Sequence, residues 1–190
     1  MIFSAVILAG GKSNRMGRDK AFLEINGKTL LARQIELARK IGAVEIFISG
    51  RMDTDYSAFA CRVLEDNYPD AGPLAGIETA LTAATHPMLL VLAVDMPEMT
   101  LDLLHRLVTF CTATTGVIPR VNGMIEPLAA IYPKAVRAAA EKMLGRQSFA
   151  VKDFATMCVQ SNLTVFVDLP AVDSASFKNC NSPDDLPCLT

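Results

Sequence analysis

The sequence is poor in the side chains that most often bind transition metals or serve as general bases. Only two histidines occur, His86 and His105, and neither lies in a motif. The five cysteines are scattered along the chain and form no C-x-x-C pair. This spacing argues against a zinc site and is typical of reduced thiols in the cytoplasm, which is the location we expect.

Long hydrophobic runs and a strong excess of charge are also missing. The longest continuous apolar stretch, residues 88–94, stops at Asp95 and is far shorter than the roughly 20 residues that span a membrane. No cationic segment precedes the apolar start of the chain, so we expect neither a signal peptide nor a membrane partner. The net charge of −2 argues against a nucleic-acid partner, which favours a basic surface.

The length and composition of the chain fit one globular domain. The chain has 190 residues, of which 51% are hydrophobic and 20% charged. Apolar, β-branched runs alternate with segments of helical periodicity. The expected strands are residues 2–8, 44–49, 62–65, 88–94, 117–119, 125–132 and 165–167. The expected helices are residues 29–41, 55–60, 73–84, 100–112, 133–144 and 148–159, with a short terminal helix from residue 182. The alternation predicts an α/β fold built on a mostly parallel, doubly wound sheet.

Local signals mark several boundaries of these elements. Thr29 and Thr100 are of the type that caps helix N-termini, and Gly42 is of the type that ends a helix. Pro73 suits the first turn of its helix. Asn122 and Gly123 favour a hairpin turn between residues 117–119 and 125–132.

The stretch of residues 8–20, Leu-Ala-Gly-Gly-Lys-Ser-Asn-Arg-Met-Gly-Arg-Asp-Lys, concentrates glycine and positive charge directly after the first strand. Gly10 and Gly11 allow a sharp turn and a close approach to a ligand. Lys12, Arg15 and Lys20 add positive charge, so the stretch indicates a triphosphate site. Its glycine spacing does not match G-x-G-x-x-G or the P-loop pattern.

These residues carry a resemblance to a known family. The stretch matches the signature L-A-G-G-x-S-x-R-M-G-x-D-K of the molybdenum cofactor guanylyltransferases, a branch of the nucleotidyltransferases. Further matching segments follow in the same order and cover nearly the whole chain: Asp66, residues 72–76 (GPLAG), 95–97 (DMP), 126–128 (EPL) and 179–184 (NCNSPD). The resemblance implies a single Rossmann-like domain over residues 1–190, with a mixed, mostly parallel sheet and helices on both faces, as in nucleotide-diphospho-sugar transferases.

The resemblance also implies a reaction and its reactants. Members of the family join GMP from GTP to the terminal phosphate of molybdopterin and release pyrophosphate. The attacking phosphate is already anionic near neutral pH, so positioning and charge neutralisation matter more than a strong base. The expected cofactor is Mg2+, and the expected partners are GTP, molybdopterin and proteins of molybdoenzyme maturation.

Specific residues are expected to carry these steps. Lys20, Arg15 and Asp95 are the catalytic candidates, and Asp95 with Asn181 the candidate ligands of Mg2+, because this ion prefers oxygen ligands. The expected nucleotide-binding residues are Leu8, Ala9, Gly10, Gly11, Lys20, Asp66, Gly72, Gly76 and Asp95. Asp66 is expected to face the base or the ribose. Some relatives carry asparagine where this chain has Ser49, so a nucleoside contact at that position stays open.

The second half of the chain is expected to hold the acceptor. We divide the domain into a nucleotide-binding part, about residues 1–110, and an acceptor-binding part, about residues 111–190. The acceptor-binding candidates are Arg120, Glu126, Arg146 and Asn179. Two alternatives remain at this point: a related nucleotidyltransferase that uses CTP or another phosphate acceptor, and a nucleotide-binding module without catalysis. The GPLAG segment and the intact LAGG favour the guanylyl branch over the cytidylyl branch. Asp95 together with Lys20 argues against a mere binding module.

Overall fold

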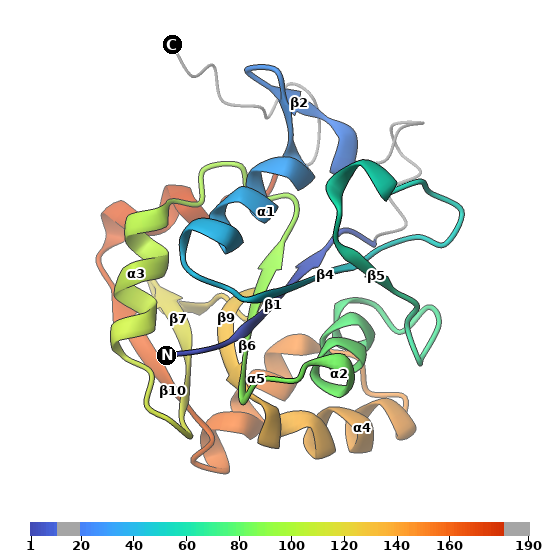
Figure 1. The fold of residues 1–190 in the computed structure, drawn as a ribbon. Helices are drawn as coiled ribbons and strands as arrows, with labels where there is room; N and C mark the ends of the chain where they lie inside the picture. Colours follow the sequence, from blue (N-terminus) through green and yellow to red (C-terminus); the bar gives the residue numbers. More distant parts are fainter. Residues whose placement is uncertain (11–19, 181–190) are drawn as a thin grey trace.

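The computed structural model describes residues 1–10 and 20–180 of the chain, and these residues form one mixed sheet with helices on both faces (Figure 1). The order of the main sheet is β10-β7-β9-β6-β1-β4-β5, and β8 pairs with β7 beside this path. The strands of this sheet are β1 (Ser4–Leu8), β4 (Glu45–Ser49), β5 (Arg62–Leu64), β6 (Met88–Ala93), β7 (Gly116–Val121), β8 (Met124–Ile125), β9 (Ala129–Pro133) and β10 (Thr164–Leu169). A small separate ribbon consists of β2 (Glu24–Ile25) and β3 (Lys28–Thr29).

Within the described residues, five α-helices cover the sheet. They are α1 (Leu30–Lys40), α2 (Pro73–Ala83), α3 (Leu101–Thr109), α4 (Arg137–Gly145) and α5 (Val151–Gln160). One hydrophobic core contains the buried side chains of α1 and α3, and the other contains those of α2, α4 and α5. Helices therefore lie on both faces of the sheet, as the resemblance implied.

The first strand shows why its sequence is apolar after Ser4. All five residues of β1 are buried, and successive side chains point to opposite faces of the sheet. Ala5 and Ile7 join the core under α1 and α3, while Val6 and Leu8 join the core under α2, α4 and α5. A strand that is covered on both faces favours apolar residues on both sides, which is the pattern of residues 5–8. The buried hydroxyl of Ser4 donates to the Glu45 carboxylate at 2.6 Å.

Several boundaries follow the local signals of the sequence. The Thr29 hydroxyl accepts a hydrogen bond from the Ala32 amide at the start of α1, and the Thr100 hydroxyl accepts one from the Leu103 amide at the start of α3. Gly42 follows the end of α1 with φ of 92°, and Pro73 is the first residue of α2. These four predictions are confirmed.

The expected hairpin forms, but the strands around it have an additional pairing. Asn122 and Gly123 adopt φ values of 51° and 78°, and β7 pairs with β8 across this turn. The chain then returns as β9, which lies antiparallel between β6 and β7. Gly116 permits this close pairing, because a Cβ atom there would lie 2.1 Å from the carbonyl oxygen of Ile131.

The strand directions bring the ends of distant segments to one edge of the sheet. Strand β1 runs parallel to β4 and β6, with Leu8 opposite Ser49 and Ala93. Strands β7 and β10 run in the same direction, because both are related to β6 through the antiparallel β9. We call the side on which β1, β4, β5, β6, β7 and β10 end the carboxyl edge. Ligands of doubly wound sheets bind at this edge.

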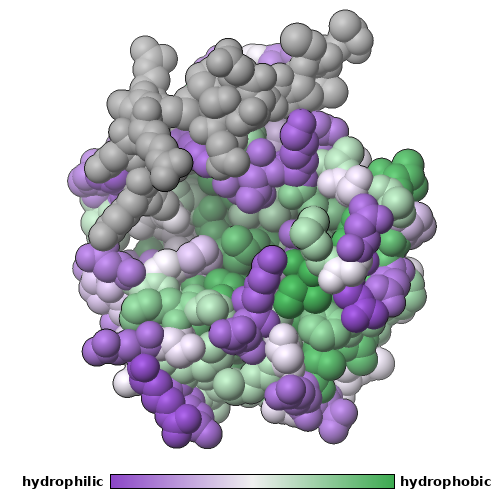
Figure 2. All heavy atoms as spheres, turned by 180° about the vertical axis from the view of Figure 1, so that it is seen from behind, coloured by the Kyte–Doolittle hydropathy of each residue, from purple (hydrophilic) through white to green (hydrophobic). Residues whose placement is uncertain are grey.

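On the face that is seen from behind, hydrophobic surface lies in the middle, with hydrophilic side chains both across it and around its periphery (Figure 2). Within residues 1–10 and 20–180, no helix has the length and apolar content that a membrane crossing requires.

Candidate active site

The glycine-rich stretch is anchored at its base to the end of the neighbouring strand. The amides of Ala9 and Gly10 both donate to the carbonyl of Ser49, at 2.8 and 2.9 Å, and the carbonyl of Leu8 accepts from the Val94 amide at 3.1 Å. The first two amides of the loop therefore bond to the end of β4. Gly11 and Arg15 lie outside the described residues.

Lys20 and Asp95 meet at the carboxyl edge, although 75 positions separate them in the sequence. Lys20 opens a 3-10 turn, Lys20–Phe22, and Asp95 follows the end of β6. The Lys20 ammonium lies 3.5 Å from a carboxylate oxygen of Asp95, and the two side chains are 14% and 22% exposed. A partly buried ion pair that keeps access to solvent is suited to receive a charged ligand.

The last part of the described chain also returns to this point of the structure. The amide of Cys180 donates to the carbonyl of Asp95 at 2.8 Å, and Cys180 is 1% exposed. This bond places the exposed Asn179 next to the catalytic candidates. Asn181, the second expected metal ligand, lies outside the described residues.

The donor set around Asp95 fits a magnesium ion better than a transition metal. Among the described residues, no three His, Cys, Asp or Glu side chains gather into a metal-binding group. Magnesium is usually held by one or two carboxylates together with water and substrate phosphates, so a single well-placed aspartate is a sufficient protein contribution. A closed cage of protein ligands, as in structural zinc sites, is not formed by this part of the chain.

Asp66 follows β5 at the same edge and bonds to the end of β4. The hydroxyl of Ser49 donates to Oδ1 of Asp66 at 3.2 Å. Burial raises the pKa of the Asp66 carboxyl above its ordinary value of 3.8, the Ser49 hydrogen bond partly offsets this, and the charge of Glu78 adds to the rise. Ser49 thus has a defined role, which is to hold Asp66.

The two glycines of the GPLAG segment have different structural roles. Gly72 precedes α2 with φ of 71°, a conformation that glycine adopts without strain. At Gly76 a Cβ atom would lie 2.3 Å from Oγ of Ser49 and 2.9 Å from Cδ2 of Leu8. Gly76 is one of the expected nucleotide-binding residues, and the space on its Cβ side is filled by Ser49 and Leu8. Its small size lets α2 approach the sheet.

A polar network that the sequence analysis missed fixes the loop after Asp66. Glu78 of α2 is 2% exposed and accepts hydrogen bonds from Nδ2 of Asn67 at 3.0 Å and from the Thr82 hydroxyl at 2.7 Å. The amide of Asn67 donates to the hydroxyl of Thr79 at 3.0 Å. A signal for this network was present, since Glu78 interrupts an otherwise apolar and small-residue helix.

The acceptor-binding candidates are only partly brought together. Arg120, near the end of β7, makes a two-bond ion pair with Asp168 of β10 at 2.5 and 2.6 Å and lies over the ring of Phe166. Glu126 lies before β9 at the same edge, and burial raises the pKa of its carboxyl above 4.5. Arg146 is exposed just beyond the end of α4. Arg120 and Glu126 thus share the carboxyl edge with Asp95, whereas no contact in the described part of the chain links Arg146 to it.

A hollow of about 260 Å³ opens beside α1 and is lined by Lys28, Arg33, Gln34, Glu36, Leu37, Lys40, Pro97 and Met99. None of the residues expected to bind nucleotide or acceptor lines it. Pro97 and Met99 place the hollow beside the turn that follows Asp95, on the side of α1.

Asp66→Asn should raise the thermal stability of the free protein and weaken GTP binding. Because the pKa of Asp66 is raised in the folded state, its ionised form destabilises the fold at every pH above that raised value. The gain in melting temperature should be present at neutral pH and shrink as the pH falls toward the ordinary value of 3.8. Melting curves across this pH range and GTP titrations measure both effects.

Asp53→Asn is the matched control for this stability effect. Arg51 lowers the pKa of Asp53 to about 2, so its ionised form does not oppose folding. The exposed Asp53 variant should show no rise in melting temperature at neutral pH. Equal shifts in the two variants would contradict the assignment of a buried, opposed charge to Asp66.

An α/β sheet with a glycine-rich stretch after the first strand and a lysine–aspartate pair at its carboxyl edge defines a nucleotide-binding enzyme domain of the nucleotidyltransferase class. Solved structures agree on the fold. The 2-C-methyl-D-erythritol 4-phosphate cytidylyltransferase of Thermus thermophilus aligns with a TM-score of 0.72 and 20% identity, covering 97% of this chain and 95% of the other. The molybdopterin-guanine dinucleotide biosynthesis protein A of Archaeoglobus fulgidus aligns with a TM-score of 0.70 and 23% identity, covering 96% and 94%.

The chain belongs to the family described as MobA-like NTP transferase domain, whose family model matches residues 5–153. A protein of Opitutus terrae named "Probable molybdenum cofactor guanylyltransferase" is 37% identical over 185 residues, covering 96% of this chain and 92% of the relative. The molybdenum cofactor guanylyltransferase of Xanthomonas euvesicatoria is 31% identical over 192 residues, covering 96% and 91%.

Proposed function

We propose that this protein is a molybdenum cofactor guanylyltransferase, which transfers GMP from GTP to molybdopterin and releases pyrophosphate. The observation that carries the proposal is the match over nearly the full length to guanylyltransferases at 37% and 31% identity. The Lys20–Asp95 pair supports it, because this pair supplies a cation for the triphosphate and an oxygen ligand for a divalent metal at one place.

The chemistry proceeds by positioning rather than by strong base catalysis. A phosphate oxygen of the acceptor attacks the α-phosphorus of GTP, a new P–O bond forms, and pyrophosphate leaves with the electrons of the broken bond. The nucleophile is already anionic, so no histidine is required. His86 agrees with this, because it contacts Ser4 and Thr85 at the opposite edge of the sheet.

Lys20 and Asp95 divide the electrostatic work. The Lys20 ammonium neutralises charge that accumulates on the triphosphate as pyrophosphate departs. Asp95 would hold Mg2+, with Asn181 as a second ligand proposed from the sequence, and the ion supplies Lewis-acid stabilisation of the phosphates. Arg15 is assigned to the same triphosphate from the sequence signature.

We assign the acceptor to the part of the carboxyl edge that is formed by β7 and β9. Arg120, Glu126 and Asn179 border the carboxyl edge on the side of β7 and β9, next to Asp95, and offer a cation, a carboxylate and an amide for a phosphorylated pterin. We retain the division into a nucleotide-binding part, about residues 1–110, and an acceptor-binding part, about residues 111–190. A protein of molybdoenzyme maturation is the expected recipient of the product.

The direct test of the proposed function is turnover with molybdopterin, GTP and Mg2+, followed by release of pyrophosphate and by identification of the dinucleotide. A guanylyltransferase releases pyrophosphate only when both substrates are present. Nucleotide binding without pyrophosphate release would favour the alternative of a binding module.

Lys20→Ala should reduce GTP affinity and the rate of transfer together, by about tenfold or more, because the triphosphate charge then lacks its compensating cation. Lys28→Ala is the matched control. Lys28 is 56% exposed and pairs with Glu36 at 2.7 Å, so it also makes a lysine–carboxylate contact, but on the outer side of α1. Its loss should leave transfer nearly unchanged. Equal losses in the two variants would mean that general surface charge, and not a specific contact, attracts GTP.

A further inference from the structure

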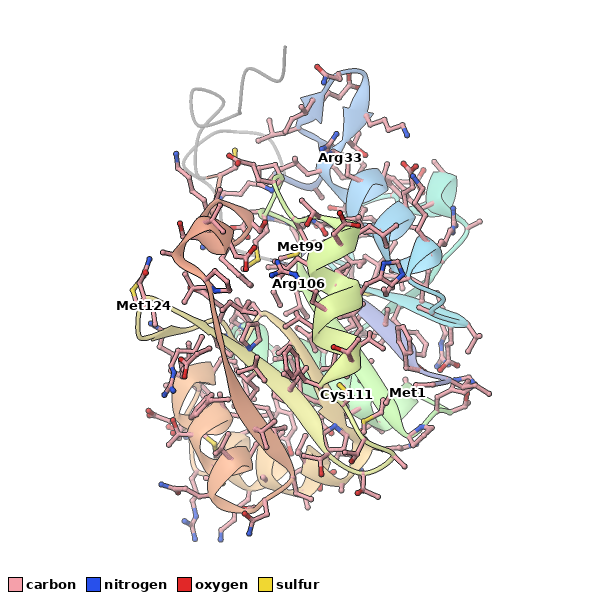
Figure 3. All side chains as sticks on the ribbon, turned by 90° about the vertical axis from the view of Figure 1, so that its left-hand side faces the viewer. Met1, Arg33, Met99, Arg106, Cys111 and Met124 are labelled. Atoms are coloured by element: carbon pink, nitrogen blue, oxygen red, sulfur yellow. The ribbon has the colours of Figure 1, made fainter. Side chains whose placement is uncertain are left out.

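Two neighbouring residues of α1 hold the turn that follows Asp95. The side-chain amide of Gln34 donates to the carbonyl of Met96 at 2.7 Å, and the guanidinium of Arg33 donates to the carbonyl of Pro97 at 3.3 Å. Figure 3 shows Arg33 near Met99, which ends this turn. Together with the bond from the Cys180 amide to the carbonyl of Asp95, these bonds fix the backbone that follows the Asp95 side chain, and the bond from the Val94 amide to the carbonyl of Leu8 fixes the backbone before it.

Gln34 is an unfavourable residue for stability alone. It is 1% exposed and lies among the buried Leu30, Leu31 and Ile35, which are all between 0% and 2% exposed. Its carbonyl oxygen Oε1 has no hydrogen-bond partner within the described residues. A buried amide with one unpaired end is costly compared with an apolar side chain of the same size. What Gln34 adds in return is one directed bond to the turn beside Asp95.

The same helix also sets the position of Lys20. The amide of Leu30, the first residue of α1, donates to the carbonyl of Leu23 at 2.8 Å, and the Leu23 amide donates to the carbonyl of Lys20 at 3.0 Å. Helix α1 therefore positions both members of the Lys20–Asp95 pair. Its first residue holds the turn that begins at Lys20, and Gln34 and Arg33 hold the turn that follows Asp95.

We propose that Gln34, assisted by Arg33, is a positioning residue that holds Asp95 in the geometry needed to bind a divalent cation for transfer. This inference rests on the proposed function. Groups that orient a metal ligand from behind commonly change metal affinity or activity by about 10–100-fold when they are removed.

The test uses the full chain with two substitutions, Gln34→Met and Arg33→Met. Methionine has nearly the length and flexibility of glutamine but cannot donate to Met96. In Gln34→Met we expect the Mg2+ concentration for half-maximal transfer to rise about tenfold. We also expect faster hydrogen exchange at the four amides of residues 95–99, since Pro97 has none, measured without metal or nucleotide. Arg33→Met should move both quantities in the same direction by a smaller factor, since its bond is longer, and it serves as the test should Gln34→Met not fold.

Thr164→Val is the matched control, because it also removes a buried polar group with an unpaired oxygen, at the start of β10. It should leave the Mg2+ requirement and the exchange of residues 95–99 unchanged. A slower Gln34→Met enzyme with the parental Mg2+ requirement and parental exchange would overturn the proposal and leave Gln34 as a packing residue. Since hydrogen exchange needs no turnover, the positioning of the turn is tested even if the parent protein does not transfer GMP.

Discussion

Asp95→Ala is expected to abolish guanylyl transfer while the protein stays folded. The carboxylate lies at the end of the fully buried strand β6 and faces Lys20 at 3.5 Å, so it is the described oxygen ligand best placed to hold Mg2+ against the triphosphate. Loss of a metal ion that stabilises transition-state charge is worth several kcal/mol. We therefore expect the rate to fall at least about a thousandfold, which corresponds to about 4 kcal/mol.

The fold should survive this change, because the Asp95 side chain is 22% exposed and its backbone bonds to Cys180 remain possible. Glu36→Ala is the control, since Glu36 also pairs with lysines, Lys28 and Lys40, at 2.7 and 2.8 Å. It should keep near-parental transfer. Near-normal turnover of a folded Asp95→Ala protein at saturating Mg2+ would contradict the assignment of Asp95 as the metal ligand.

The second large effect concerns the base. We expect GTP to be preferred to CTP and ATP by tenfold or much more. Guanine presents its N1–H and its amino group side by side, whereas adenine has an acceptor at N1 and cytosine has a different pattern. Asp66 accepts from Ser49 through Oδ1, which leaves Oδ2 to receive a donor from the nucleoside.

The size of this preference follows from the cost of unpaired polar groups. A base that leaves one buried group of the site unpaired costs about 1–3 kcal/mol for that group. A site built to bond a substrate N–H therefore discriminates strongly against an analogue without it. The expected preference for GTP is assigned to the loop of residues 66–76 as a whole. It therefore holds whether Asp66 itself contacts the base or the ribose.

The features that local chemistry decides could be predicted from the sequence. Thr29 and Thr100 cap their helices, Gly42 follows the end of α1, and Asn122–Gly123 makes the hairpin turn. The apolar runs at β1 and β6 identified central strands. Because β1 and β6 are parallel, the residues that follow them lie at one edge of the sheet, where Lys20 and Asp95 meet.

The contacts that depend on long-range packing could not be predicted in this way. Strand β9 pairs with β6, whose residues lie some forty positions earlier, and the sequence of the hairpin does not encode that choice. The bond between Cys180 and Asp95 likewise depends on how the last part of the chain returns to the sheet. Gly76 illustrates the same limit, because its close neighbours Leu8 and Ser49 belong to two other strands.

The roles of Gln34 and Glu78 could be predicted only in part. Each is a polar residue on the buried face of its helix, which is visible in the sequence, but its bonding partner is not. Gln34 lies on the stripe of α1 formed by Leu30, Leu31, Ile35 and Ala38, where an apolar residue is expected. Glu78 is a buried acid on a helix whose other buried residues are apolar or small. A polar residue on a buried helix face indicates a bond to a neighbouring loop. Only the fold shows that Gln34 bonds to the loop after Asp95 and that Glu78 bonds to the loop after Asp66.

The most direct measurement of the central claim is a competition among nucleotides. The purified protein is supplied with molybdopterin, Mg2+ and equal concentrations of GTP, CTP and ATP, and the dinucleotide product is identified. The predicted result is molybdopterin guanine dinucleotide in at least about tenfold excess, because we propose that the polar groups of the loop of residues 66–76 pair with guanine and not with cytosine or adenine. Predominant cytosine dinucleotide would contradict the guanylyl assignment while leaving nucleotidyl transfer intact, and the absence of any dinucleotide would contradict the transferase itself.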